Sequence, residues 1–300
     1  MGAKLKSNIL LLLTAAIWGF SFVAQRLGME YIGAFTFNGI RFAFGGFSLL
    51  PLILFYKNNN SKPSLYIAHK SVFIAGTISG LILFLGSSFQ QVGLIGTTAG
   101  KAAFITGLYI IIVPILGVFL KQRLGINYWV GSILAIIGLY FLCVTNGFSV
   151  SYSDYLELIG AFFFAVHIVL IDYLSSKYDV LKLAFFQFIT CSFLSLLVAV
   201  FFETITMDGI LKSMLPILYG GILSVGVAYT LQIVAQKSAE PSHAAIILSM
   251  ESVFAAIGGF IILNETLIMN QFLGCLLMFL GIIVSQVDFK KLITNNSISN

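Results

Sequence analysis

Two charged side chains lie inside apolar stretches, where they could bind a solute or carry a proton. Lys101 is part of TTAGKAAFITGLYIIIVP, residues 97–114, and Glu251 is near the middle of AAIILSMESVFAAIGGFIIL, residues 244–263. An ionised carboxylate at the centre of a bilayer costs about 2.5–3.5 kcal/mol, and a glutamate is too short to reach the surface. We therefore expect Glu251 to be protonated, paired or open to a wet cavity, which suits either proton coupling or a structural hydrogen bond.

Lys101 poses a different question, because it lies near one end of its apolar stretch. A helix that starts near Thr97 places Lys101 only about 5–6 Å deep. Its ammonium group can then reach the interface, or it can face a cavity and bind an anionic group of a substrate. The sequence leaves both interpretations open.

Other polar and aromatic residues in the apolar stretches are candidates for the same cavity. We expect substrate contacts from Trp18, Ser21, Asn38, Arg41 and Tyr109, in addition to Lys101. Trp18 and Ser21 share one helical face, and Asn38 and Arg41 are one turn apart. Aromatic walls beside polar groups suit an organic solute. Packing and structural pairing are the alternatives for these residues.

Histidine and acidic residues complete the set of titratable candidates. His167 lies in mid-stretch, so we take it, with Glu251, as a candidate for coupling. A hydrogen-bonded interior histidine is the alternative. Glu157, Asp172 and Glu203 lie near the ends of stretches, where we expect contact with solvent.

The composition identifies an integral membrane protein. Hydrophobic residues make up 59% of the 300 residues and charged residues 9%, whereas soluble domains carry roughly 25% charged residues. The net charge of +5 follows from basic loops and does not indicate nucleic-acid binding. Cys143, Cys191 and Cys275 have no metal spacing, and no catalytic or nucleotide-binding motif is present. We expect a protein that is not an enzyme and has no cofactor, with the lipid bilayer, a small-molecule substrate and protons as partners.

Ten apolar runs of about 20 residues, long enough to cross a bilayer, follow one another along the chain. We place them at 8–28, 34–56, 70–92, 97–120, 127–146, 153–174, 181–203, 213–236, 240–264 and 268–287. The termini and even-numbered loops hold twelve Lys and Arg residues, whereas the odd-numbered loops hold Lys212 and, at a helix end, Arg26. The positive-inside rule then places both termini in the cytoplasm.

The chain also contains an internal repeat. LGINYWVGSILAIIG, residues 124–138, and LIMNQFLGCLLMFLG, residues 267–281, share the pattern L-x-x-N-x-x-x-G-x6-G. Each lies between the fourth and fifth run of its half, and because five is odd, the two halves point in opposite directions. We expect an all-α integral membrane protein with ten transmembrane helices in two inverted five-helix repeats, residues 1–147 and 148–300. Such repeats are typical of secondary transporters.

The chain resembles the drug/metabolite transporter superfamily, EamA type, over nearly its whole length. The resemblance rests on AAIWGFSFVAQRLG, on Arg41 after FNGI, and on the stretches that begin TTAGKAAFITGLYIIIVP and SHAAIILSMESVFAAIGG. It implies a central cavity lined by helices one to four and six to nine, with helices five and ten peripheral. It also implies export of small organic solutes. One departure is Ser252, which follows Glu251 where the family often has proline.

We therefore expect a multi-pass plasma-membrane protein that exports amino acids or related metabolites by secondary-active alternating access. A facilitator or importer of the same solutes is the alternative within transport. A membrane-embedded sensor without transport is the alternative from another class.

Overall fold

The computed structural model describes residues 2–59, 66–121, 125–143, 151–262 and 269–286. Within these ranges the chain is helical and contains no strand. Eight helical segments of the described chain are long and apolar enough to cross a membrane, and shorter apolar helices lie at Ile126–Phe141 and Phe272–Ser285. The protein is thus an all-helical, multi-pass membrane protein, and the shorter helices coincide with the fifth and tenth expected spans. Ten crossings and cytoplasmic termini stay predictions, and the expected boundary between residues 147 and 148 lies outside the described residues.

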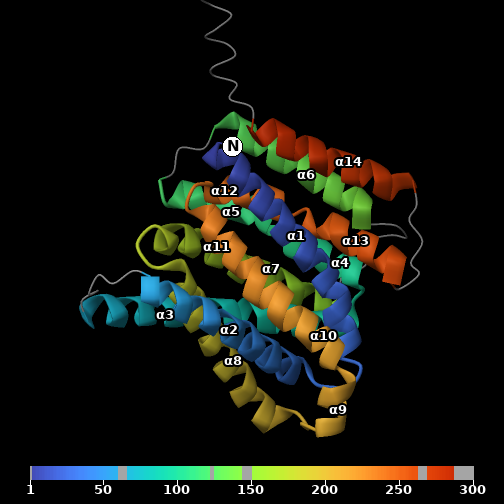
Figure 1. Ribbon diagram of the computed structural model, residues 1–300. Helices are drawn as coiled ribbons and strands as arrows, with labels where there is room; N and C mark the ends of the chain where they lie inside the picture. Colours follow the sequence, from blue (N-terminus) through green and yellow to red (C-terminus); the bar gives the residue numbers. More distant parts are fainter. Residues whose placement is uncertain (1, 60–65, 122–124, 144–150, 263–268, 287–300) are drawn as a thin grey trace, which may run out of the picture.

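The first half of the chain forms six α-helices and one short 3-10 turn (Figure 1). They are α1 (Ala3–Gly28), α2 (Ala34–Asn59), α3 (Tyr66–Gly93), η1 (Leu94–Gly96), α4 (Ala99–Gly107), α5 (Tyr109–Phe119) and α6 (Ile126–Cys143).

The second half contains an eleven-residue π-helix between α-helical segments. Its elements are α7 (Tyr152–Ser175), α8 (Val180–Phe202), α9 (Met207–Lys212), α10 (Met214–Leu218), η2 (Tyr219–Tyr229), α11 (Thr230–Gln236), α12 (Pro241–Leu248), α13 (Glu251–Ile262) and α14 (Met269–Gln286). A π-helix widens the turn and leaves backbone groups free to bond elsewhere.

Polar caps fix the ends of two helices. Ser151 and Asp154 form a capping box at the start of α7, each side chain bonding the other residue's backbone N–H. The start of α2 is capped from another helix, because the Glu203 carboxylate accepts from the N–H groups of Phe35 and Thr36 at 2.8 and 2.7 Å. Glu203 is half-buried, so a residue that we expected to contact solvent also ties the end of α8 to α2.

Two of the expected spans are interrupted near their middles. The fourth run divides into α4 and α5 at Leu108, and the ninth divides into α12 and α13 at Ser249 and Met250. The second break lies just before Ser252, which occupies the position where the family often has proline. The helix is thus interrupted here although no proline is present. The Ser252 hydroxyl donates to the carbonyl of Ala103 in α4 at 2.7 Å. The two interrupted helices are therefore bonded to each other.

Pro114 sits inside α5 and removes one backbone donor. The carbonyl of Ile110, four residues earlier, accepts a hydrogen bond from the Ser132 hydroxyl of α6 at 3.3 Å. A side chain of the neighbouring helix thus replaces the bond that the proline cannot make, which matters because no water is present in the hydrocarbon core.

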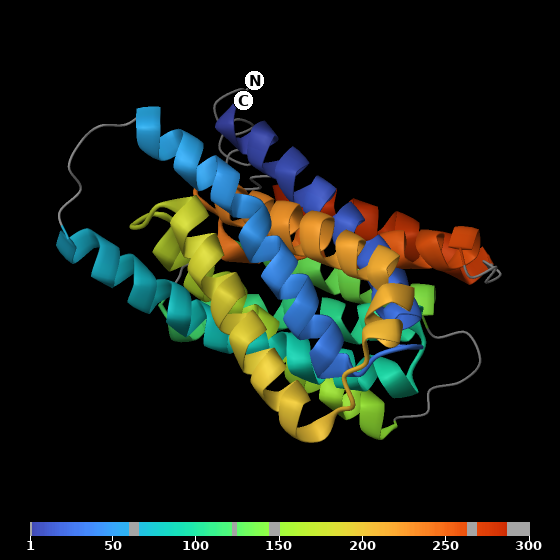
Figure 2. The same ribbon diagram turned by 60° about the horizontal axis from the view of Figure 1, so that its bottom comes forward.

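The two helices that contain the repeated motif, α6 and α14, pack against each other (Figure 1). The motif glycines form the contact: a Cβ atom on Gly131 would lie 2.7 Å from the carbonyl oxygen of Gly281, and one on Gly138 would lie 2.6 Å from that of Gly274. The motif glycines therefore allow α6 and α14 to pack closely against each other in antiparallel orientation. The remaining long helices form the body of the molecule, where α8 runs beside α2 and α3 and α1 packs on α13 and η2 (Figure 2).

Gly131→Ala should destabilise the protein, although alanine is the better helix former. The added methyl meets backbone atoms of α14, which cannot move aside as a flexible side chain can, and overpacking of this kind costs about 1–3 kcal/mol. Thermal unfolding in detergent, followed by the fraction that remains monodisperse, measures the effect. Gly100→Ala in α4 is the matched control, because a Cβ there has no atom within 4 Å. Equal stability of the two variants would contradict the close approach.

Candidate functional site

A cavity of about 450 Å³, its open space included, lies at the centre of the bundle. Its lining side chains come from both halves of the chain and from neither α6 nor α14. They are Trp18, Ser21, Phe22, Gln25, Arg41, Gln90, Thr106, Tyr109, Phe164, His167, Ile168, Ser224, Tyr229, Gln232 and Glu251. The seventh expected span, α8, contributes no lining residue.

Arg41 brings a positive charge to this cavity. Only 3% of the residue is exposed, and its Nε donates to Asn38 Oδ1 at 2.9 Å. Asn38 is held in turn by its own Nδ2, which donates to the carbonyl of Ser87 in α3 at 3.0 Å. The guanidinium also lies near the rings of Phe37 and Phe42, 5.7 and 5.1 Å from their centroids.

No carboxylate of the described chain lies within ion-pair distance of the Arg41 guanidinium. The two ion pairs found among the described residues are Lys101–Asp154 and Lys212–Asp208. Isolated charges are rarely buried unless they are paired or hydrogen-bonded, because leaving water is costly. A buried guanidinium that makes one hydrogen bond within the described chain, on the wall of a cavity, is suited to bind an anionic group.

Glu251 lines the same cavity and begins α13, directly after the break in the ninth span. It is 3% exposed, and its Oε1 has no hydrogen-bond partner in the described chain. Tyr109 begins α5, directly after the break in the fourth span. The Tyr109 hydroxyl, like Glu251 Oε1, is buried and has no hydrogen-bond partner in the described chain. Each interrupted helix thus delivers one polar group to the cavity, as broken membrane helices do at ligand sites.

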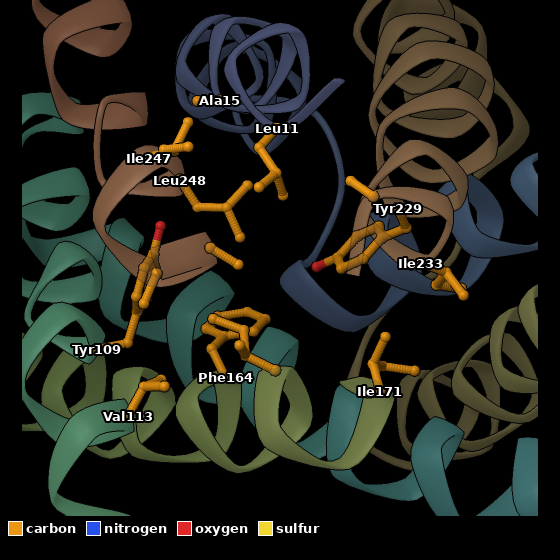
Figure 3. Packing of buried hydrophobic residues seen from close by; sticks show 14 of the residues in the cluster. Leu11, Ala15, Tyr109, Val113, Phe164, Ile171, Tyr229, Ile233, Ile247 and Leu248 are labelled. Carbon is orange, nitrogen blue, oxygen red and sulfur yellow. The ribbon is translucent and has the colours of Figure 1, made fainter. Parts of the chain in front are cut away.

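Aromatic rings form the opposite wall (Figure 3). The Tyr229 ring lies 4.5 Å from that of Trp18, centroid to centroid, and 6.0 Å from that of His167. Figure 3 places Tyr109 and Tyr229 on either side of the space and Phe164 between them. The π-helix holds this wall in place, because Trp18 Nε1 donates to the carbonyl of Ser224 at 3.2 Å. These faces can cover the apolar part of a solute while polar groups bind its charged ends.

His167 is held by the helix behind it. The residue is 1% exposed, and its Nε2 lies 3.1 Å from Oε1 of Gln187 in α8. Among the described residues the ring therefore has one hydrogen-bond partner, and another side of it faces the cavity. This position suits both a structural and a titrating role.

The structure brings six of the eight sequence-predicted residues to one cavity: Trp18, Ser21, Arg41, Tyr109, His167 and Glu251. Asn38 lies behind Arg41 and positions it. Lys101 lies away from the cavity wall, with Nζ 2.7 Å from Asp154 Oδ2 and 26% of its side chain exposed.

Glu157 was expected to contact solvent, and this expectation was wrong. The side chain is fully buried and its Oε2 accepts from the Thr106 hydroxyl at 3.1 Å. It fits because Gly93 of α3 leaves room: a Cβ at Gly93 would lie 2.9 Å from the Glu157 Cγ. The position of a residue along its helix predicts how deep it lies in the membrane. Whether its side chain is buried depends on the helix that packs against it.

Two amides that line the cavity were not predicted from the sequence. Gln90 and Gln232 both reach it, from α3 and α11. A signal was present, since the two glutamines are separated by 142 residues, as are Tyr109 and Glu251. The glycine motif repeats after 143 residues, so the repeat pairs these residues only with a one-residue shift between the two segments.

The site offers a cation, a carboxyl group, amides, hydroxyls and aromatic faces in one space. This set suits binding of a small polar or charged organic solute. Among the described residues, no three His, Cys, Asp or Glu side chains gather in a way that could hold a metal ion.

Known proteins match the chain along its length. The model of the EamA-like transporter family matches residues 5–144 and 152–286. An uncharacterized transporter of Archaeoglobus fulgidus is 33% identical over 287 residues, which cover 94% of this chain and 86% of that protein. The uncharacterized transporter YoaV of Bacillus subtilis is 23% identical over 286 residues, covering 92% of this chain and 94% of YoaV.

A solved structure shares the fold. The crystal structure of a protein with 17% sequence identity matches with a TM-score of 0.78, covering 95% of this chain and 98% of that one. Together with the helical bundle and its central cavity, the matches identify a multi-pass membrane transporter. The chain belongs to the EamA-like transporter family.

Proposed function

We propose that the protein is a secondary-active transporter that exports amino acids or related small organic metabolites across the plasma membrane by alternating access. The observation that carries the proposal is the pairing of opposite chemistry in one cavity: the Arg41 guanidinium and the Glu251 carboxyl both line it, and they form no ion pair with each other. An anionic group of a solute can pair with the Arg41 guanidinium. A proton or an ammonium group of the solute can neutralise the Glu251 carboxylate.

The substrate class follows from this arrangement. A carboxylate can accept two parallel hydrogen bonds from a guanidinium, which is the strongest and most directional contact available here. Trp18, Phe164 and Tyr229 supply faces for an apolar body. Amino acids and related amphipathic metabolites have both parts within a small volume. Ser21 and Tyr109 are the proposed hydroxyl contacts.

Coupling is assigned to Glu251 and His167, which both line the cavity. Ionising a carboxyl group that is removed from water costs free energy, and a cation bound nearby lowers that cost. Proton binding at Glu251 and solute binding in the same cavity can therefore influence each other. That mutual influence is what a secondary transporter requires.

Alternating access is supported by contacts that join the two halves at separate places. The Lys101–Asp154 ion pair connects the starts of α4 and α7. His243 Nε2 lies 2.8 Å from Asn8 Oδ1 and connects the starts of α12 and α1. In an inverted repeat the two pairs are equivalent, since each joins the fourth span of one half to the first span of the other half. They then lie at opposite ends of the helix bundle. We propose that they close the cavity toward the outer and inner sides, and that Lys101 meets the substrate when its ion pair opens.

Transport by purified protein in liposomes tests the function. A mixed amino-acid and metabolite panel is offered with and without an imposed pH gradient, to the wild type and to Glu251→Gln. We expect flux driven by the gradient, and loss of that driving in Glu251→Gln because the neutral amide cannot exchange a proton. Gradient-independent flux that the substitution leaves unchanged would indicate a facilitator. Absence of flux for every solute would favour a sensor.

Arg41→Ala should weaken binding of carboxylate-bearing solutes by at least tenfold, since a hydrogen bond to a charged group contributes about 1.5–3 kcal/mol. Trp18 provides the readout: the chain has two tryptophans, and Trp129→Phe leaves the one in the cavity. Fluorescence titration in that background measures the dissociation constant of each solute.

Arg26→Ala is the matched control, because Arg26 is an exposed arginine at the end of α1. It should bind as the parent does. Unchanged affinity in Arg41→Ala, or equal losses in the two variants, would refute the anchoring role of Arg41.

A further inference from the structure

A second buried carboxyl group, Glu157, lies outside the cavity wall and has no role in the function proposed above. It is fully buried, and its Oε1 has no hydrogen-bond partner in the described chain. Its other oxygen accepts from the Thr106 hydroxyl at 3.1 Å. No ion pair to Glu157 is found in the described chain. A carboxylate in this position would be a buried, uncompensated charge.

Glu157 is linked to the central cavity by hydrogen bonds. Gln90 Nε2 donates to Thr106 Oγ1 at 3.1 Å, and the same hydroxyl donates to Glu157. Both Gln90 and Thr106 line the cavity. The Thr106 hydroxyl therefore stands between the buried carboxyl and the space in which solute and water are bound.

The charged groups around Glu157 are few. Asp154 lies one turn earlier on α7 and is occupied by Lys101 of α4 at 2.7 Å. Glu251 of α13 lines the cavity that Thr106 also lines. The facing segments add no cation, because α5, η1 and α3 from Ser71 onward contain no charged residue. Lys101 is thus already paired with Asp154, and no ion pair in the described chain compensates a charge on Glu157.

We propose that Glu157 carries a proton in this conformation and exchanges it with the central cavity through Thr106, as a proton-binding site separate from Glu251. In the structure the Thr106 hydroxyl donates to Glu157, so it must first turn toward water in the cavity, and the carboxyl O–H then turns to donate to the Thr106 oxygen. In the transfer, the Glu157 O–H bond breaks as a new Thr106 O–H bond forms. The Thr106 hydroxyl releases its own proton to water in the cavity. Glu157 is left as a carboxylate, and the return path reverses the same two bonds.

Separation of the Lys101–Asp154 pair would shift the equilibrium between the protonated and the ionised form of Glu157. While the pair is intact, the lysine is committed to Asp154. When α4 and α7 move apart, the ammonium is released one helical turn from Glu157, where a positive charge favours the carboxylate. Opening at that end of the bundle would then be accompanied by loss of the Glu157 proton.

Infrared difference spectroscopy of purified protein tests proton occupancy without transport and without a known solute. A protonated carboxyl absorbs apart from carboxylates in its carbonyl-stretch band. We expect a band at neutral pH that disappears in Glu157→Gln and persists in Asp172→Asn, a half-buried acid at the other end of α7. A difference spectrum in which Glu157→Gln removes no band would overturn the proposal.

Deuterium exchange tests the path through Thr106. The Glu157 band should shift more slowly after transfer to heavy water in Thr106→Val, which keeps the side-chain shape but removes the hydroxyl. An unchanged exchange rate would overturn the assigned path. If Glu157→Gln does not fold, carbon-13 labelling of glutamate in the Glu251→Gln background assigns the remaining band in the otherwise intact protein: a labelled band supports Glu157, and its absence refutes it. Failure of transport leaves these spectra unaffected, so the two proposals fail independently.

Discussion

Burial of the Arg41 guanidinium among apolar helices is the constraint on which the central part of the structure depends. Asn38 must point back toward Arg41, and the backbone of α3 must come close enough for the Ser87 carbonyl to hold Asn38. The rings of Phe37 and Phe42 cover the cation on its other sides. Because these contacts do not neutralise the charge, the remaining donors require water or a ligand, and a cavity is the result.

The same constraint explains why irregular backbone gathers at the centre. Exposed backbone groups cannot be tolerated against lipid, but they can line a cavity or bond to neighbouring side chains. The breaks before Tyr109 and Glu251 and the π-helix at Tyr219–Tyr229 all lie at this level of the bundle. Ser252 and Trp18 supply donors to the carbonyls nearby. By contrast, the α6–α14 pair is regular and closely packed, which suits a support outside the site.

Hydropathy and charge made the main part of this architecture predictable. The apolar runs coincide with the helices, and Arg41 and Glu251 attracted attention because a charge inside such a run is costly wherever it points. The sequence did not reveal which face of each helix points toward the cavity, or which residues of neighbouring helices meet. Lys101 therefore had two interpretations from sequence alone, because its partner Asp154 belongs to another helix. Glu157 was misjudged because Gly93, which leaves room for it, also belongs to another helix.

The helix interruptions were the least predictable feature. Pro114 lies six residues beyond the break at Leu108, and no proline accompanies the break at Ser249. Both breaks occur where helices of opposite halves meet, as the Ser252–Ala103 hydrogen bond illustrates. They are thus consequences of packing between the halves, which a linear pattern does not report.

Access to the cavity from the two faces of the membrane is the most direct test of the account. With Cys143, Cys191 and Cys275 replaced by alanine, a Ser21→Cys protein carries a single thiol on the cavity wall. A membrane-impermeant thiol reagent applied to oriented vesicles from either side should label it, and a bound solute should slow both reactions. Labelling from one face alone, unaffected by solute or pH gradient, would contradict alternating access to a central binding site.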